Sequence, residues 1–215
     1  MSGAIIVTGT DTNIGKTVFA AALTSALKGY YWKPVQAGLS GETDAQIVAR
    51  LSGAAPDHIL PEAFRLQLAA SPHLAAERDG VAISAEQLAV PNVSGPLIIE
   101  GAGGLLVPLS RKLLQIDLFC AWKAPVILCA STRLGTINHT LLSVEALKQR
   151  GIAILGVAFM GDENSDSERT IAEIGGVRRL GRLPRLDPLD KVALDAAFVN
   201  NFKLADVLGL GAMGP

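Results

Sequence analysis

Charged residues are scarce in this sequence of 215 residues. Only 18% are Asp, Glu, Lys or Arg, the formal net charge at pH 7 is -1, and Lys and Arg form no basic tract. We therefore expect no nucleic-acid partner, because no basic tract complements the charge of its phosphates. With 49% hydrophobic residues the chain can bury a sizeable core, and its length fits one α/β domain. We expect a single domain over residues 1–215 that acts on a small molecule.

Long apolar runs are also absent. No stretch approaches the roughly 20 apolar residues that a membrane-spanning helix needs. The segment from Met1 to Val7 lacks the basic lead-in and the length of a secretion signal. We expect a cytoplasmic protein with no membrane partner.

Cysteine is rare as well. Cys120 and Cys129 both lie in apolar stretches, and they form no CxxC pair. Such a pattern is typical of core packing, and a disulfide is the weaker interpretation because nothing indicates an oxidising compartment.

Short β-branched runs alternate with helical patterns along the chain. Strands are expected at Ile5–Val7, Tyr30–Val35, Leu97–Ile99, Val126–Ala130 and Ile154–Phe159. Helices are expected at Lys16–Leu27, Asp44–Leu51, Ala85–Ala89, Ile116–Trp122, Thr136–Gln149 and Asp166–Ile174. The strands are continuous apolar runs, which indicates burial on both faces. We predict an α/β fold, a single doubly wound and mostly parallel sheet with helices on both faces, with Ala54–Pro61 as an insertion loop.

Residues 9–17, with the sequence GTDTNIGKT, connect the first strand to an Ala-rich helix. This context favours a phosphate-binding P-loop of the NTPase type over a plain glycine-rich turn. Backbone N–H groups would face the phosphates, Lys16 would reach the β- and γ-phosphates, and Thr17 could ligate Mg²⁺. The spacing departs from G-x4-G-K-[ST], because Thr10 stands where the first glycine is expected. The expected nucleotide contacts of this variant loop are Asn13, Ile14, Gly15, Lys16, Thr17 and Val18.

A carboxylate follows the strand Leu97–Ile99. Glu100 begins the sequence EGAGG, in which small residues let a ligand approach the backbone. Because Mg²⁺ favours a few hard oxygen ligands, Glu100 is a candidate ligand beside Thr17. Asp44 could supply a third oxygen, although from its position alone it is better explained as an acidic residue at the start of a helix.

Lys33 is followed by Pro34 in a short apolar strand. A lysine in such a place is ordinarily solvated. If its strand lies beside the P-loop strand, Lys33 would emerge near the γ-phosphate and could stabilise the charge that develops during transfer. The residues alone leave both interpretations open.

Six motifs together resemble the dethiobiotin synthetase family in content and order. They are GTDTxxGKT at 9–17, KPV at 33–35, TD at 43–44, SPH at 71–73, EGAGG at 100–104 and LGTINH at 134–139. The resemblance implies that 7,8-diaminopelargonate, CO₂ and ATP yield dethiobiotin, ADP and phosphate in the presence of Mg²⁺, as a step of biotin synthesis. It also implies a homodimer with active sites at the subunit interface.

The resemblance further implies roles for individual residues. Lys33 and Lys16 become the catalytic lysines, and Thr17, Asp44 and Glu100 become the Mg²⁺ ligands. The further nucleotide contacts would be Asp44, Glu100, Gly101, Ala102, Gly103, Met160, Gly161, Pro184, Arg185 and Leu186. The substrate contacts would be Thr10, Lys33, Ala37, Gly104, Gly135, Thr136, Ile137 and Asn138, of which the segment 135–138 comes from the opposite subunit.

Two residues depart from the family pattern. Ala37 stands where the family often has a Ser or Thr that contacts substrate. Met160 stands where many members have an asparagine that hydrogen-bonds the adenine, and a thioether is only a weak acceptor. We hypothesise that nucleobase discrimination is relaxed.

Two other functions compete with this interpretation. A P-loop amidoligase of the cobyrinate-diamide-synthase type would normally carry an additional glutamine-hydrolysing domain, for which no room remains. A nucleotide-switched partner-binding protein would be expected to carry a signature lysine early in the loop, where Asp11 stands, and a membrane-targeting tail. The end of the chain from Leu204 is instead expected to be a last helix that runs into a glycine-rich end.

Overall fold

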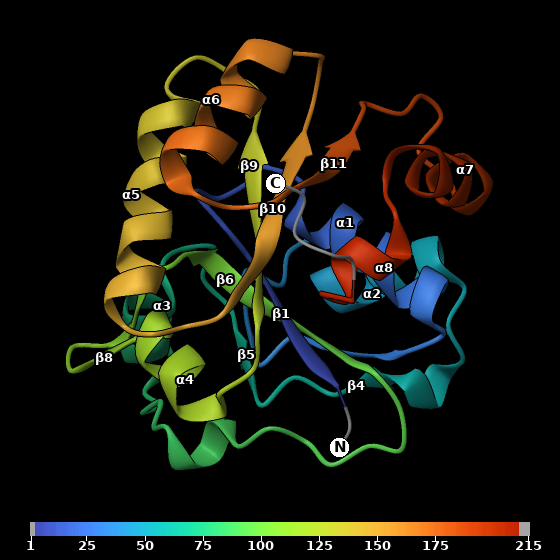
Figure 1. Ribbon diagram of the computed structural model, residues 1–215. Helices are drawn as coiled ribbons and strands as arrows, with labels where there is room; N and C mark the ends of the chain where they lie inside the picture. The colour runs from blue at the N-terminus through green and yellow to red at the C-terminus, as the bar shows by residue number, and fades with distance from the viewer. Residues whose placement is uncertain (1–2, 211–215) are drawn as a thin grey trace.

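A seven-stranded sheet runs through the middle of the molecule (Figure 1). The computed structural model describes residues 3–210. The strands are β1 (Ala4–Gly9), β2 (Tyr30–Trp32), β4 (Ile59–Leu60), β6 (Leu97–Gly104), β9 (Val126–Ser131), β10 (Ile154–Met160) and β11 (Arg179–Leu183). Their order is β11-β10-β9-β1-β6-β2-β4, and every pairing is parallel. The predicted doubly wound parallel sheet is confirmed.

Helices cover both faces of this sheet. One face carries α1 (Lys16–Leu27), α2 (Asp44–Ser52), α7 (Lys191–Asn201) and α8 (Leu204–Val207), and the other carries α4 (Gln115–Trp122), α5 (Thr136–Gln149) and α6 (Ser165–Gly175). Successive residues of a strand point to opposite faces of the sheet. Ile5 and Val7 pack with α1, whereas Ile6 packs with α4. Burial on both sides explains why the strands are apolar throughout.

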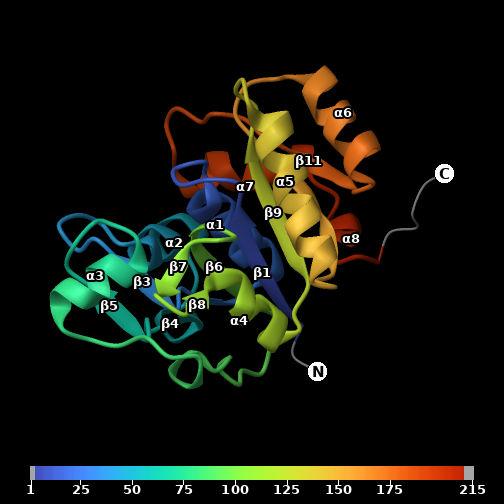
Figure 2. The same cartoon turned by 90° about the vertical axis from the view of Figure 1, so that its left-hand side faces the viewer.

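A smaller lobe lies beside the main sheet (Figure 2). It contains β3 (Val35–Ala37), β5 (Phe64–Leu66), α3 (Pro72–Asp79), β7 (Pro108–Ser110) and β8 (Leu113–Leu114). Strand β3 pairs in parallel with β5, and β7 pairs antiparallel with β8. Val35, Leu66, Ala75 and Leu109 form the core of this lobe.

The strand predicted over Tyr30–Val35 is wrong in its second half. Strand β2 ends at Trp32, and Val35 begins a different sheet. Pro34 has no N–H to donate to a ladder, so the chain leaves the main sheet here. This break brings Lys33 out of the sheet at its carboxyl edge.

The loop predicted over Ala54–Pro61 is also wrong. It holds a turn of 3-10 helix, Pro56–His58, and then β4, which pairs with β2. The helix predicted over Ala85–Ala89 is a single 3-10 turn, Glu86–Leu88. Six further elements were not predicted at all: β5, α3, β7, β8, β11 and α7.

The helices predicted over Lys16–Leu27 and Thr136–Gln149 are confirmed at both ends. Cys129 is buried and Cys120 is half-buried, and both are free thiols. The helix expected from Leu204 is α8, whereas the glycine-rich end after Leu210 lies outside the described residues. Within residues 3–210, no helix is both long enough and apolar enough to cross a membrane.

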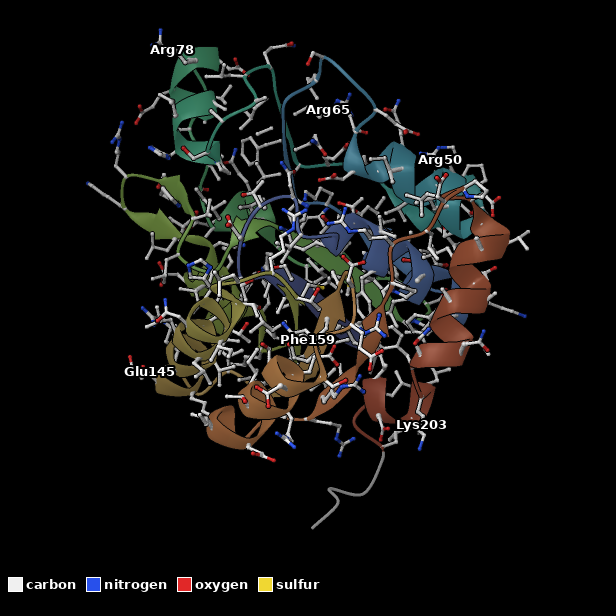
Figure 3. The ribbon with its side chains drawn as sticks, turned by 90° about the horizontal axis from the view of Figure 1, so that it is seen from above. Arg50, Arg65, Arg78, Glu145, Phe159 and Lys203 are labelled. Atoms are coloured by element: carbon white, nitrogen blue, oxygen red, sulfur yellow. The ribbon has the colours of Figure 1, made fainter. Side chains whose placement is uncertain are left out.

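The carboxyl ends of the strands meet at the upper edge of the sheet in Figure 1, and Figure 3 looks down on that edge. In this view Arg50, Arg78, Glu145 and Lys203 lie around the rim, while Phe159 lies near the middle. Ligands of open parallel sheets bind at this edge. The loops that leave β1, β2 and β6 therefore define the candidate site.

Candidate active site

The phosphate-binding loop joins β1 to α1. Its turn places Asn13 (φ 56°) and Gly15 (φ 100°) in the left-handed region, which glycine adopts without strain. Among residues 3–210, no side chain caps the amino terminus of α1, and its first turn holds no acidic residue. The free N–H groups and the positive end of the helix dipole are therefore available to an anion.

Lys16 is the first residue of α1 and folds back across this loop. Its Nζ donates to the carbonyl oxygen of Asp11 at 2.7 Å, and only 6% of the residue is exposed. Burial, followed by the nearby Lys33 charge, lowers the pKa of Lys16. A phosphate in the loop would supply the opposite charge that favours the ammonium form.

Three oxygen-bearing side chains from distant parts of the sequence meet beneath the loop. Thr17 Oγ1 lies 3.0 Å from Asp44 Oδ1 and 2.9 Å from Glu100 Oε1. The hydroxyl has one proton, so it donates to only one carboxylate at a time. The three groups form a hard-oxygen set of the kind that Mg²⁺ accepts, with other positions left to water and phosphate. These residues therefore fit a Mg²⁺ ion.

No larger metal-binding group exists in the described part of the chain. Residues 3–210 contain no cluster of three or more His, Cys, Asp or Glu side chains that could hold a metal ion. The set at Thr17 has only two carboxylates. It would hold Mg²⁺ weakly unless a nucleotide supplied phosphate oxygens as well.

Lys33 lies between the same two carboxylates. Its Nζ is 2.6 Å from Asp44 Oδ2 and 3.0 Å from Glu100 Oε1, and it donates to the carbonyl oxygen of Gly101 at 3.2 Å. Burial alone would lower the pKa of Lys33, but Glu100 and Asp44 outweigh burial and raise it. The lysine is therefore charged and 4% exposed, and the interpretation of Lys33 as a solvated residue is wrong.

Asp44 is presented by the first turn of α2. Thr43 is the N-cap, and its capping box with Gln46 uses a 2.8 Å bond from the Thr43 N–H and a 3.4 Å bond to the Thr43 hydroxyl. The Asp44 carboxylate thus points to Thr17 and Lys33. Burial alone would raise the pKa of Asp44, but Lys33, with smaller contributions from Thr17 and Lys16, outweighs burial and lowers it.

Three buried residues support the site and were not predicted. Gln36 accepts a hydrogen bond from the Asp44 N–H at 3.1 Å. Gln115, at the start of α4, accepts from the Ala102 N–H and donates to the Gly104 carbonyl at 3.0 Å, so it braces the loop after Glu100. Tyr31 donates to Glu100. Only Tyr31 had a sequence signal, because it stands two residues before Lys33 on an extended chain.

A cavity of about 780 Å³ opens beside the phosphate-binding loop. Nine of the predicted nucleotide contacts line it: Asn13, Ile14, Gly15, Val18, Met160, Gly161, Pro184, Arg185 and Leu186. Met160 packs against the loop, with its Cγ 3.4 Å from the position that a Cβ on Gly15 would take. The sheet thus brings the segments after β10 and β11 to the same cavity as the loop.

A second cavity of about 510 Å³ lies on the other side of the loop. Thr10 and Gly104 line it together with apolar residues that follow β6 and with the exposed side of α5. Thr10 and Thr136 also line the larger cavity. The other predicted substrate contacts are not among the residues that line either cavity: Lys33, Ala37, Gly135, Ile137 and Asn138.

Comparison with known proteins first identifies the structural class to which the chain belongs. A family model described as an AAA domain matches residues 3–193. The septum site-determining protein MinD of Pyrococcus horikoshii superimposes with a TM-score of 0.51 at 15% identity, over 92% of this chain and 86% of that one. A ParA family ATPase of Chlorobium tepidum has a TM-score of 0.50 at 10% identity, over 93% and 91%. The fold and the loop are those of a P-loop ATPase.

Curated relatives then identify the family within this class. A protein of Rhodopseudomonas palustris strain HaA2 is 64% identical over 97% of this chain and 98% of its own length, and one of Agrobacterium fabrum is 60% identical over 99% and 100%. Both are named ATP-dependent dethiobiotin synthetase BioD. This chain belongs to the ATP-dependent dethiobiotin synthetase family.

Proposed function

We propose that this chain is a dethiobiotin synthase, which uses ATP to build the ureido ring of dethiobiotin from 7,8-diaminopelargonate and CO₂. Family membership supports the reaction. The observation that carries the proposal is the convergence of Thr17, Lys33, Asp44 and Glu100 beneath a phosphate-binding loop.

The chemistry requires positive charge more than it requires a base. One amine of the substrate captures CO₂ as a carbamate, whose oxygen takes the γ-phosphoryl group of ATP and releases ADP. The second amine then attacks the carbonyl carbon, loses a proton and expels phosphate. Because the carbamate is already anionic, the obstacle is the approach of two anions, which cations relieve.

The nucleotide is proposed to bind along the larger cavity. The N–H groups from Asn13 to Val18 would hold the phosphates, with Lys16 at the β- and γ-phosphates. Gly101, Ala102 and Gly103 would approach the terminal phosphate. The base would lie between Met160–Gly161 and Pro184–Leu186, which line the far part of that cavity.

Thr17, Asp44 and Glu100 are proposed to hold Mg²⁺ together with the nucleotide phosphates. When bound, the ion would neutralise phosphate charge and orient the γ-phosphoryl group. The fit of these oxygens is the support for this part of the proposal.

Lys33 is proposed to neutralise the carbamate and the transferred phosphoryl group. Without nucleotide it balances Asp44 and Glu100, so its charge is held in the site before substrates arrive. Lys16, whose ammonium lacks a carboxylate at hydrogen-bond distance among residues 3–210, would act from the opposite side of the phosphates.

The diaminopelargonate chain is proposed to lie in the smaller cavity, between Thr10, Gly104 and α5. The amino terminus of α5, at 135–138, suits its distal carboxylate. We further propose a homodimer in which this helix end comes from the second copy. The exposed leucines at the cavity mouths, Leu106, Leu134 and Leu142, support such a partner surface.

Mass spectrometry tests the reaction directly. The protein is incubated with diaminopelargonate, bicarbonate, Mg²⁺ and ATP, and dethiobiotin and ADP are quantified. We expect the two products in equal amounts. ATP turnover without dethiobiotin would reject the proposal and would favour an amidoligase or a nucleotide switch.

A further inference from the structure

Tyr31 lies on β2, the strand next to the β6 strand that carries Glu100. Its side chain is fully buried, and its hydroxyl donates to Glu100 Oε2 at 2.7 Å. In the pairing of β2 with β6, Tyr31 lies beside Ile98, two residues before Glu100. Side chains two apart on a strand share a face, so Tyr31 and Glu100 emerge on the same side from adjacent strands.

The two oxygens of Glu100 have separate partners. Oε1 faces Thr17 Oγ1 at 2.9 Å and Lys33 Nζ at 3.0 Å, whereas Oε2 is bonded by Tyr31. The distance of 2.7 Å is typical of a well-formed hydrogen bond from a hydroxyl to an oxygen. Glu100 is 1% exposed, so water cannot easily replace the missing partner if this hydroxyl is removed.

The terminal torsion of a glutamate is soft, and a carboxylate can turn its oxygens with little intrinsic cost. A donor on Oε2 restricts that rotation. We propose that Tyr31 is a positioning residue that acts through Glu100: it holds Oε2 and thereby keeps Oε1 directed at Thr17 and Lys33, where the divalent cation of the nucleotide complex binds. This inference rests on the proposed role of Thr17, Asp44 and Glu100 as ligands.

A merely structural role would also give Tyr31 a buried hydroxyl with an acceptor. The two roles differ in what removal of the hydroxyl changes. A structural hydroxyl contributes to the stability of the fold alone. A positioning hydroxyl sets the affinity for the cation, because groups that orient metal ligands typically contribute 10- to 100-fold to metal affinity.

The experiment measures Mn²⁺ binding in the presence of ADP by electron paramagnetic resonance. Tyr31→Phe keeps the ring and removes only the hydroxyl, and we expect the Mn²⁺ Kd to rise by about 10-fold or more. An unchanged Kd overturns the proposal, whatever happens to the melting temperature. The measurement needs no substrate, so it is independent of whether the wild-type protein makes dethiobiotin.

The chain supplies a matched control in its only other tyrosine. Tyr30 is adjacent, and its hydroxyl contacts Ser94 Oγ at 3.0 Å, away from Glu100. Tyr30→Phe should leave the Mn²⁺ Kd unchanged. In a Glu100→Gln background, Tyr31→Phe should cause no further loss of Mn²⁺ affinity, because the effect passes through the carboxylate. A full additional loss in that background would contradict the proposed route.

A second measurement does not depend on the folding of Tyr31→Phe. The protein is labelled with ¹³C at tyrosine Cζ. The Tyr30→Phe variant retains a single labelled tyrosine, Tyr31, so its one remaining resonance is assigned to Tyr31. We expect Mg²⁺ with ADP to shift this resonance, whereas ADP alone shifts it less. A Tyr31 resonance that is indifferent to Mg²⁺ would overturn the inference.

Discussion

Lys33 lies beneath the phosphate-binding loop, in contact with two carboxylates and near a second lysine. Its ammonium contacts Asp44 and Glu100 within 3.0 Å, and the pKa of the nearby Lys16 is lowered by burial and then by the charge of Lys33. In this buried setting the two carboxylates stabilise the charge of Lys33, whereas the two lysines repel each other. The same setting makes each lysine effective against anionic substrates, because little water screens it.

Replacing Lys33 should reduce the chemical step selectively. We expect Lys33→Ala to bind ATP but to lose at least about 10²-fold in turnover, the scale of removing one electrostatic stabiliser. Steady-state rates and a nucleotide-binding titration measure the two effects separately. Lys203→Ala, at a lysine that Figure 3 places at the rim, is the control and should be neutral. A near-normal rate for Lys33→Ala would remove this lysine from the mechanism.

Asp44 predicts how stability depends on pH. Its pKa is lowered in the folded protein, so it stabilises the fold above its unfolded pKa, and this contribution is lost as the pH falls through the folded pKa. In urea unfolding without nucleotide, the wild type should lose more stability than Asp44→Asn as the pH falls below the ordinary value of 3.8. Parallel losses in the two proteins would show that the contacts with Lys33 contribute nothing.

Single site residues were predicted when they belong to a sequence motif. They were missed when their role depends on hydrogen-bond partners from another part of the chain. Glu100 and Lys33 belong to motifs that a resemblance can match. Gln115 does not, because its role comes from bonds to Ala102 and Gly104 that exist only once α4 packs beside β6. The roles proposed for Ala37 and Asn138 stay predictions, since neither residue lines the two cavities.

Among the elements, α2 matters most because its first residue enters the site. Thr43 caps the helix through a capping box, whereas Ser71 stands at the N-cap of α3 with no side-chain cap bond. Thr43→Ala should therefore destabilise the protein by about 1 kcal/mol in urea unfolding, and Ser71→Ala should cost less. The 3.4 Å bond that the Thr43 hydroxyl accepts is long, and Thr43→Ala keeps the backbone N–H that donates to Gln46, so the loss should not exceed this value. Equal losses in the two variants would contradict this account.

The helices α1 and α5 were predicted to the residue because they are long and glycines flank them, whereas short elements were missed. Tyr30–Val35 looks like one strand because every residue except Lys33 and Pro34 is apolar or aromatic. The break follows from tertiary pairing, in which Val35 finds Phe64 of β5 as its neighbour. Strand β4 has only two residues, Ile59 and Leu60, too few to show a period.

At the scale of the whole molecule, the exposed leucines at the cavity mouths beside α5 favour contact with a second copy of the chain. Sedimentation should give about twice the 22.4 kDa of one chain. Leu142→Asp, at a cavity mouth and 57% exposed, should shift the protein toward monomer. Val192→Asp, at an exposed valine on α7, is the matched control and should leave the mass unchanged. A wild type that sediments as a monomer would reject the dimer.

In the proposed reaction, ATP phosphorylates a carbamate on this chain. This step is tested by supplying ¹⁸O-labelled bicarbonate with diaminopelargonate, Mg²⁺ and ATP, and by following the label in phosphate and in dethiobiotin by mass spectrometry. Because the carbamate oxygen that takes the γ-phosphoryl group leaves with it, we expect one ¹⁸O atom in the released phosphate and one in the ureido group. Dethiobiotin formed with unlabelled phosphate would contradict the mechanism.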